Sequence, residues 1–353
     1  MIGKRLLACF VTAAFGISIA GIISVSAVTT EKNTGYTIED IRNLQDFLLV
    51  RETPDLRDKD YDLNDDGRWN VFDLCLMKRK YVKTLQSEED ISSSNIEDLT
   101  YEYAIEELYA NRDGNQIYGI VYIPQNAGAQ MPAVIFSHGF GGNYQVGTQY
   151  AEALAEKGYV VYCFDFCGGS PGSRSDGSTL EMSIFTEQTD LEAVITMLQG
   201  LDYVDSDNLF LMGTSQGGAV SAITAAAHKE EIQGAILFYP AFCLVDQTKE
   251  RFDSIEDIPD TYFLMWMTVG RAYAENLLDY DIYDAISSYE KDVLILHGDA
   301  DSIVPLSYSE KALEVYSSAR LEVFPGAGHG FHGQDTQQAI GLMLEYLDSH
   351  RNQ

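Results

Sequence analysis

The sequence is poor in basic residues. It has 23 Lys and Arg against 54 Asp and Glu in 353 residues, which gives a formal net charge of −31 at pH 7. Nucleic-acid binding needs cationic side chains that neutralise phosphates, and adsorption to an anionic membrane surface needs them as well. The deficit therefore argues against both kinds of partner. It is compatible with a soluble secreted protein, or with one that carries acidic calcium sites.

Cysteine is also scarce, with five residues in the chain. No two of them form a CxxC pair, and none has a metal-binding spacing with histidine, so no zinc centre is expected from them. Cys75 and Cys163 fall in apolar patterns that favour buried thiols, while pairing of Cys167 with Cys243 stays open. The chain also lacks GxGxxG and P-loop sequences, so no nucleotide cofactor is expected.

The N-terminal segment has the pattern of an export signal. Lys4 and Arg5 precede a run over residues 6–25 that is almost wholly apolar or small, and Val25-Ser26-Ala27 reads as a small-residue cleavage site. The pattern predicts a signal peptide over residues 1–27 and an extracellular, secreted protein. The alternative is a membrane anchor, because the apolar run is near the lower limit for a span.

Residues 62–73 have the spacing of a calcium loop. Oxygen-bearing residues fall at loop positions 1, 3, 5, 9 and 12, a glycine stands at position 6, and position 7 offers its carbonyl. Calcium prefers many hard oxygen ligands in a flexible cage, and this spacing supplies them. The alternative is a metal-free turn rich in Asp and Asn. The predicted Ca²⁺ ligands are Asp62, Asn64, Asp66, Arg68, Asn70 and Asp73.

This loop ends in Asp rather than Glu, and a predicted helix over residues 71–81 follows it at once. Residues 38–41 echo the start of that helix, but residues 29–40 lack the acidic ligands and the glycine of a second loop. The combination resembles a type I dockerin, so residues 28–81 are expected to form a small all-α, EF-hand-like module with one structural calcium. The resemblance implies a cohesin module of a scaffold protein as a possible partner, and attachment to a cellulosome-like complex.

Residues 82–98 are rich in Ser and acidic residues and predict a solvated linker. From Leu99 onward, short apolar runs alternate with amphipathic helical patterns. The expected strands are 116–123, 133–136, 159–164, 209–212, 235–238, 293–296 and 321–324, and the expected helices are 150–157, 187–199, 217–228, 307–316 and 337–350. This alternation predicts a doubly wound, mostly parallel α/β sheet over residues 99–353, with its active site beyond the carboxyl ends of the strands. Residues 241–290, roughly, leave the rhythm and are expected to form a lid insertion.

The clearest chemical motif is Gly213-Thr214-Ser215-Gln216-Gly217, which follows a predicted strand and precedes a helix of small residues. A bare GxSxG is a weak signal, but in the strand–turn–helix context it predicts a nucleophile elbow with Ser215 as the nucleophile. A tetrahedral oxyanion needs main-chain N–H donors. We expect these from Gln216, which follows the nucleophile, and from Phe140 in the glycine-rich loop after the strand 133–136.

A serine hydroxyl needs a base, and the base needs an orienting acid. In elbows of this kind the chain order is Ser, acid, His. His329 follows the last predicted strand and is the expected base, with His332 as the fallback. Asp301 and Asp299 compete for the role of the acid, and the pattern His-Gly-x-x-Asp-x-x-Val-Pro favours Asp301.

Three segments, His-Gly-Phe-x-Gly, Gly-x-Ser-Gln-Gly-Gly and the pattern around Asp301, together resemble the α/β-hydrolase superfamily, and within it the bacterial cinnamoyl/feruloyl esterases and related carboxylesterases. The resemblance implies a serine carboxylesterase that cleaves feruloyl, cinnamoyl or similar esters of plant cell-wall polysaccharide without a catalytic cofactor. The alternatives are an acetyl-xylan-type esterase, a prolyl-oligopeptidase-like peptidase, or a cohesin- or calcium-binding protein with an inert hydrolase domain.

In those esterases the insertion caps the acyl pocket. Its aromatic side chains either stack on a phenolic ring or form a small core of the insertion itself. They are Phe242, Phe252, Tyr262, Phe263, Trp266 and Tyr273.

Overall fold

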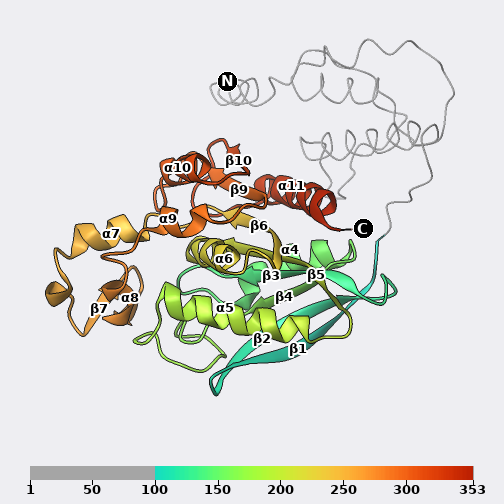
Figure 1. The fold of residues 1–353 in the computed structure, drawn as a ribbon, viewed down its shortest axis with the longest axis horizontal. Coiled ribbons are helices and arrows are strands. Elements are labelled where there is room, and N and C mark those ends of the chain that lie inside the picture. Colours follow the sequence, from blue (N-terminus) through green and yellow to red (C-terminus); the bar gives the residue numbers. More distant parts are fainter. Residues whose placement is uncertain (1–99, 353) are drawn as a thin grey trace, which may run out of the picture. The chain divides into compact units, whose positions relative to one another are not determined.

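A computed structural model describes residues 100–352, the unit drawn in colour in Figure 1. The expected signal peptide 1–27, the calcium module 28–81 and the linker 82–98 lie outside the described residues, so those interpretations stay predictions. Within residues 100–352 no helix is long and apolar enough to cross a membrane.

An eight-stranded sheet runs through the unit in the order β1-β2-β4-β3-β5-β6-β9-β10. Its strands are β1 (Tyr103–Arg112), β2 (Asn115–Pro124), β3 (Met131–Ser137), β4 (Val160–Phe164), β5 (Val204–Thr214), β6 (Ile232–Phe238), β9 (Val293–Gly298) and β10 (Ala319–Phe324). The hairpin β1–β2 is antiparallel and β2 is antiparallel to β4, whereas the other neighbours are parallel. This confirms the predicted mostly parallel sheet, and an antiparallel hairpin forms its edge.

The turn of that hairpin shows how local sequence sets the register. Asp113 and Gly114 both have positive φ, 50° and 95°, as the two central residues of a tight hairpin turn require. The strand residues on either side, Arg112 and Asn115, then face each other.

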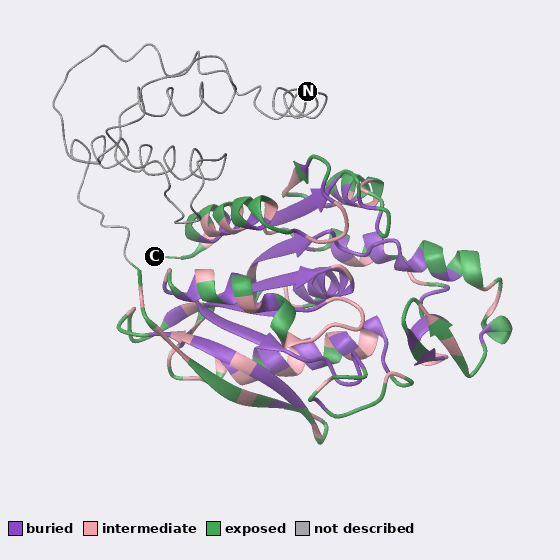
Figure 2. Cartoon of the chain, turned by 180° about the vertical axis from the view of Figure 1, so that it is seen from behind, coloured by how far each residue is buried: buried purple, intermediate pink, exposed green. Residues whose placement is uncertain are grey.

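Helices cover both faces of the sheet. They are α4 (Thr148–Ala155), α5 (Ile184–Gln199), α6 (Gln216–Ala227), α10 (Ser307–Val315) and α11 (Gln334–His350), with a short 3₁₀ turn η2 (Tyr144–Gly147) before α4. Successive residues of β3 point to opposite faces: Ala133 and Ile135 join the core beneath α5 and α6, and Val134 and Phe136 join the core beneath α4 and α11. The central strands are therefore buried on both sides (Figure 2), which explains their unbroken apolar sequences.

Between β6 and β9 the chain builds the expected insertion, the gold and orange elements at one end of the unit in Figure 1. It holds α7 (Leu244–Arg251), the 3₁₀ turn η3 (Ile255–Asp257), a two-stranded sheet of β7 (Thr261–Leu264) and β8 (Met267–Gly270), α8 (Ala272–Glu275) and α9 (Ile282–Ser287). Some of its aromatic residues are buried and others are exposed. Phe242 and Tyr273 are buried, whereas Phe263 and Trp266 are 62% and 57% exposed.

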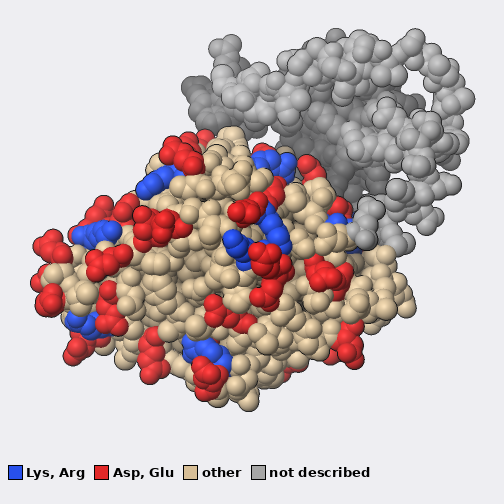
Figure 3. Space-filling view, viewed as in Figure 1, with Lys and Arg blue, Asp and Glu red and all other residues tan. Residues whose placement is uncertain are grey.

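Cys163, Cys167 and Cys243 are free and buried. The question that the sequence left open is thus answered, since Cys167 and Cys243 do not pair. The face in Figure 3 carries acidic side chains over most of its extent with scattered Lys and Arg, and shows no broad basic patch that would suit a polyanion.

Candidate active site

Ser215 sits on a tight turn between β5 and α6. Its backbone has φ 53° and ψ −119°, a conformation with positive φ that residues other than glycine rarely adopt. The Ser215 N–H donates to the Phe238 carbonyl at 2.9 Å, and the Ser215 carbonyl accepts from the Ala241 N–H at 2.9 Å. The neighbouring strand β6 and the chain after it therefore hold the turn from both sides.

The two flanking glycines of the motif are required by close backbone contacts. A Cβ on Gly213 would overlap the Gly217 carbonyl, and a Cβ on Gly217 would overlap the carbonyls of Ser137 and His138 at the end of β3. Only glycine lets the helix start this close to the two strands. The sequence motif is thus explained by packing at the elbow.

A continuous hydrogen-bond chain joins the three predicted triad members. His329 Nε2 lies 2.9 Å from Ser215 Oγ, and His329 Nδ1 lies 2.7 Å from Asp301 Oδ2. Because a carboxylate accepts hydrogen bonds, Nδ1 carries the proton and Nε2 is free to accept from the serine hydroxyl. The structure places these residues on the loops after β5, β9 and β10, at the carboxyl ends of the strands.

Asp301 is held by more than the histidine. Its second oxygen, Oδ1, accepts from the main-chain N–H groups of Ile303 at 2.8 Å and Val304 at 2.9 Å. These bonds fix the carboxylate in the plane that faces the imidazole. The competing Asp299 instead accepts from the Gly326 N–H at 2.6 Å, and the fallback base His332 is exposed on the surface. The structure brings neither of them into the triad.

The buried His297 has a structural role. Its Nε2 donates to the Val304 carbonyl at 2.9 Å, and its Nδ1 lies 2.7 Å from the Ser309 hydroxyl. Burial lowers the pKa of His297, which favours the neutral imidazole. The ring thus braces the loop that carries Asp301.

The loop after β3 passes beside the nucleophile. A Cβ added to Gly139 would lie 3.1 Å from Ser215 Cβ, so the loop that carries Phe140 runs directly beside the serine. His138 braces this loop: its Nδ1 donates to the Gly139 carbonyl at 2.8 Å and its Nε2 accepts from the Phe166 N–H at 3.2 Å. Burial lowers the pKa of His138, in keeping with a neutral ring that both donates and accepts.

Gln216, the other expected oxyanion donor, is the first residue of α6, where main-chain N–H groups have no partner within the helix. The residue is 1% exposed, and its side chain contacts Met182 as well as Glu187, whose role the sequence did not indicate, and Tyr273 of the insertion. Gln216 Nε2 donates to Glu187 at 2.8 Å, and the Tyr273 hydroxyl donates to Gln216 Oε1 at 2.5 Å. The helical spacing of Glu187 with Leu191, Val194 and Leu198 was a signal that this carboxyl lies on the buried face of α5.

The insertion contributes aromatic rings beside this loop. The Phe140 ring lies edge-on to Trp266 and to Tyr273, with centroid distances of 5.6 Å in both cases. A Cβ on Gly141 would overlap the Trp266 indole, so Trp266 covers the loop after β3, although more than half of Trp266 is exposed.

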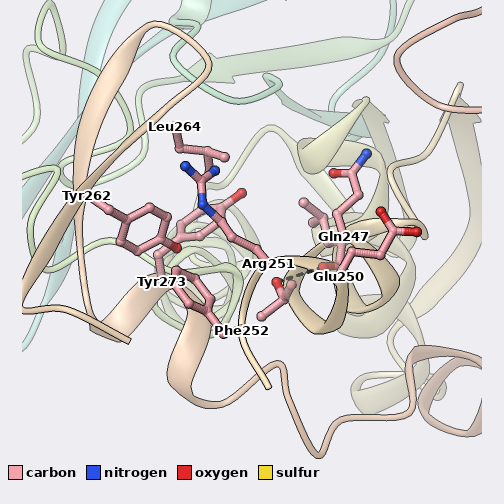
Figure 4. A pocket seen from close by; sticks show the side chains of 9 residues that line it. Gln247, Glu250, Arg251, Phe252, Tyr262, Leu264 and Tyr273 are labelled. Carbon is pink, nitrogen blue, oxygen red and sulfur yellow. Dashed lines mark hydrogen bonds between the residues drawn. The ribbon is translucent and has the colours of Figure 1, made fainter. Parts of the chain in front are cut away.

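A cavity of about 380 Å³ opens within the insertion. Aromatic rings and the polar side chains of α7 line it (Figure 4). The guanidinium of Arg251 lies over the ring of Tyr262, 5.1 Å from the ring centroid. The lining side chains drawn and labelled in Figure 4 are Gln247, Glu250, Arg251, Phe252, Tyr262, Leu264 and Tyr273. Its volume lies in the range of small-molecule sites.

Comparison with known proteins supports the same chemistry. The family model described as serine aminopeptidase S33 matches residues 128–274, a range that includes Ser215. The monoglyceride lipase of Saccharomyces cerevisiae is 26% identical over 295 residues, covering 69% of this chain and 93% of that protein.

Two solved structures extend the similarity over most of the chain. Est1E from Butyrivibrio proteoclasticus, solved with ferulic acid bound, has a TM-score of 0.62 and 26% identity over 68% of this chain and 99% of its own. Acetyl xylan esterase 1 from Thermoanaerobacterium shares the fold, with a TM-score of 0.54 and 21% identity over 72% of this chain and 86% of its own. With this fold, these similarities and a serine at the elbow, the chain is an enzyme of the α/β-hydrolase fold, a carboxylic ester hydrolase.

Proposed function

We propose that this enzyme is a secreted serine esterase that removes feruloyl, cinnamoyl or similar acyl groups from plant cell-wall polysaccharide. The observation that carries the proposal is the hydrogen-bond chain from Asp301 through His329 to Ser215. The similarity to Est1E with bound ferulic acid and the aromatic insertion beside the elbow support the choice of acyl group.

The reaction follows from the geometry. Ser215 Oγ attacks the ester carbonyl while His329 Nε2 takes its proton, and Asp301 stabilises the imidazolium that results. The main-chain N–H groups of Phe140 and Gln216 donate to the developing oxyanion, each contributing about 10²–10³-fold to the rate. His329 then gives the proton to the leaving alcohol. In the second half of the reaction, a water molecule attacks the acyl-enzyme while His329 takes its proton, and His329 passes that proton to Ser215 Oγ as the carboxylic acid leaves.

In this proposal the N-terminal residues export the enzyme and attach it near its substrate. Residues 1–27 direct export, and residues 28–81 form a dockerin-like module whose single calcium loop uses Asp62 to Asp73. This module attaches the enzyme to a cohesin of a scaffold protein, close to its polymeric substrate. Calcium is structural here, and catalysis uses no cofactor.

Initial rates on methyl ferulate, acetylated xylan and nitrophenyl acetate test the acyl preference. We expect the highest kcat/KM on methyl ferulate. A preference for acetylated xylan would favour the acetyl-xylan-type alternative, and absence of turnover on all three would refute the esterase proposal.

Two variants of the same hairpin sharpen the test. Trp266→Ala removes a ring that contacts Phe140, whereas Phe263→Ala removes a similarly exposed ring with no such contact in the described residues. We expect Trp266→Ala to lower the ratio of kcat/KM for methyl ferulate over nitrophenyl acetate by about 2- to 10-fold, since a lost aromatic stack costs about 0.5–1.5 kcal/mol. Phe263→Ala is expected to leave the ratio unchanged.

A further inference from the structure

The side chain of Gln216 is the centre of a buried polar network. A carboxyl oxygen of Glu187 lies 2.8 Å from Gln216 Nε2, and the Tyr273 hydroxyl lies 2.5 Å from Gln216 Oε1. Since the amide NH₂ can only donate and the amide oxygen can only accept, the direction of both bonds is fixed. The network therefore holds the Gln216 side chain in one orientation, directly beside the main-chain N–H that it carries.

The three residues come from three separate parts of the fold. Glu187 is in the first turn of α5, which the reciprocal capping bonds of Ser183 and Thr186 hold in place. Gln216 begins α6, and Tyr273 belongs to α8 of the insertion. The Gln216 amide is thus clamped between the main domain and the insertion.

Tyr273 also contacts the other predicted oxyanion residue. Its ring packs edge-on against Phe140 at 5.6 Å, and it lines the cavity of the insertion shown in Figure 4. One buried tyrosine therefore contacts both of the predicted oxyanion-donor residues.

We propose that Tyr273 and Glu187 are positioning residues of the oxyanion hole, which fix the donors at Gln216 and Phe140 and couple them to the insertion. This inference rests on the proposed serine-esterase function. It adds that the insertion, besides shaping the substrate site, helps to complete the catalytic site.

Energetics favour this role over a purely structural one. Glu187 is buried, and burial together with the nearby Asp190 raises its pKa well above the usual range. Asp190, one turn later, has its own partner in Arg112 at 3.1 Å, so the cation does not compensate Glu187 directly. An apolar side chain of similar size avoids this desolvation, so fold stability alone does not explain a carboxyl here.

The test uses four variants of the full chain. Tyr273→Phe removes only the hydroxyl, Glu187→Leu removes the acceptor, and Glu187→Gln keeps an acceptor oxygen for Gln216. Tyr283→Phe is the matched control, because Tyr283 is a buried tyrosine of the same insertion whose hydroxyl donates to the Tyr308 carbonyl at 3.0 Å.

The main measurement is the second-order rate of Ser215 labelling by a fluorophosphonate, which needs the triad and the oxyanion hole but no particular ester. We expect about a 10-fold fall for Tyr273→Phe and Glu187→Leu, less than the 10²–10³-fold effect of losing a donor altogether. The fall should appear in kcat on nitrophenyl acetate with KM nearly unchanged, because the donors act in the transition state. Glu187→Gln and Tyr283→Phe should stay within about 3-fold of the parent.

The outcomes separate the two proposals. If the parent enzyme is labelled and hydrolyses esters, but Tyr273→Phe and Glu187→Leu are labelled at the parental rate and only their melting temperatures fall, the network is structural and the positioning role is refuted. If Ser215 of the parent is not labelled at all, both the proposed function and this inference fail. A loss for Tyr283→Phe equal to that for Tyr273→Phe would also refute the role, since it would show a general effect of the insertion.

Discussion

The backbone conformation of Ser215 predicts that the Ser215→Gly variant is more stable than the Ser215→Ala variant. With φ 53° and ψ −119° the residue sits in a region that costs a residue other than glycine about 1–3 kcal/mol. Ser215→Ala and Ser215→Gly both delete the hydroxyl and its hydrogen bond to His329, so that loss cancels when the two variants are compared. They differ only in the Cβ, which carries the strain.

The magnitude follows from two opposing terms. Glycine releases the strain of about 1–3 kcal/mol, but it costs about 0.5–1 kcal/mol more than alanine in unfolded-state entropy. We therefore expect Ser215→Gly to be more stable than Ser215→Ala by about 1 kcal/mol. For a domain of this size that difference raises Tm by about 2–4 °C.

Scanning calorimetry of the two purified variants measures the difference. The same pair of substitutions at Ser221, in the interior of α6, is the control, because glycine there should be less stable than alanine by about 1 kcal/mol. The reasoning fails if Ser215→Gly melts at or below Ser215→Ala while the Ser221 pair behaves as expected.

Three further predictions concern the triad, pH and calcium. His329→Ala and Asp301→Asn should each lower kcat on nitrophenyl acetate by about 10³-fold or more, whereas Asp299→Asn should keep most of the parental kcat. The reverse order for the two aspartates would overturn the assignment of the acid. Because burial raises the pKa of Glu187, the folded state keeps a proton that the unfolded chain releases above about pH 4.3, so the parent loses stability as pH rises from there. The advantage in Tm of Glu187→Gln over the parent should therefore grow between pH 5 and pH 8, and a constant difference would contradict a raised pKa. Calorimetric titration of the full chain with calcium should show one site, at residues 62–73, and two equivalent sites would refute the single-loop interpretation.

The sequence was informative wherever the chain is buried on both sides or turns sharply. The apolar run 133–136 is typical of a strand buried on both faces, and it lies in β3. A backbone contact within the elbow requires glycine at 213, and contacts with the end of β3 require glycine at 217, so the motif reports both the turn and its packing. The chain order of Ser215, Asp301 and His329 follows from the sheet, and the structure brings these three side chains together.

The network around Gln216 was not foreseen, because it depends on tertiary contacts. Glu187 and Tyr273 are 86 residues apart and meet the same amide only after the insertion folds against α6. The helix α5 also begins at Ile184, earlier than its apolar periodicity alone indicated, because the capping pair Ser183 and Thr186 is not the usual combination with a Glu or Gln. The aromatic residues of the insertion could not be divided into core and surface from composition alone.

Three costs to stability in this domain lie around the nucleophile. Ser215 has a strained backbone, Glu187 is a buried carboxyl, and His138 is a buried imidazole whose pKa is lowered by desolvation. Each of them contacts, or is bonded to, a segment that carries the serine or a predicted oxyanion donor. A fold selected only for stability would place glycine or apolar residues at such positions, because strain and desolvation each cost on the order of 1–3 kcal/mol. Substitutions at these sites should therefore stabilise the fold and lower turnover. Because the strained and desolvated groups surround the proposed nucleophile, they support placing the chemistry there independently of any sequence similarity.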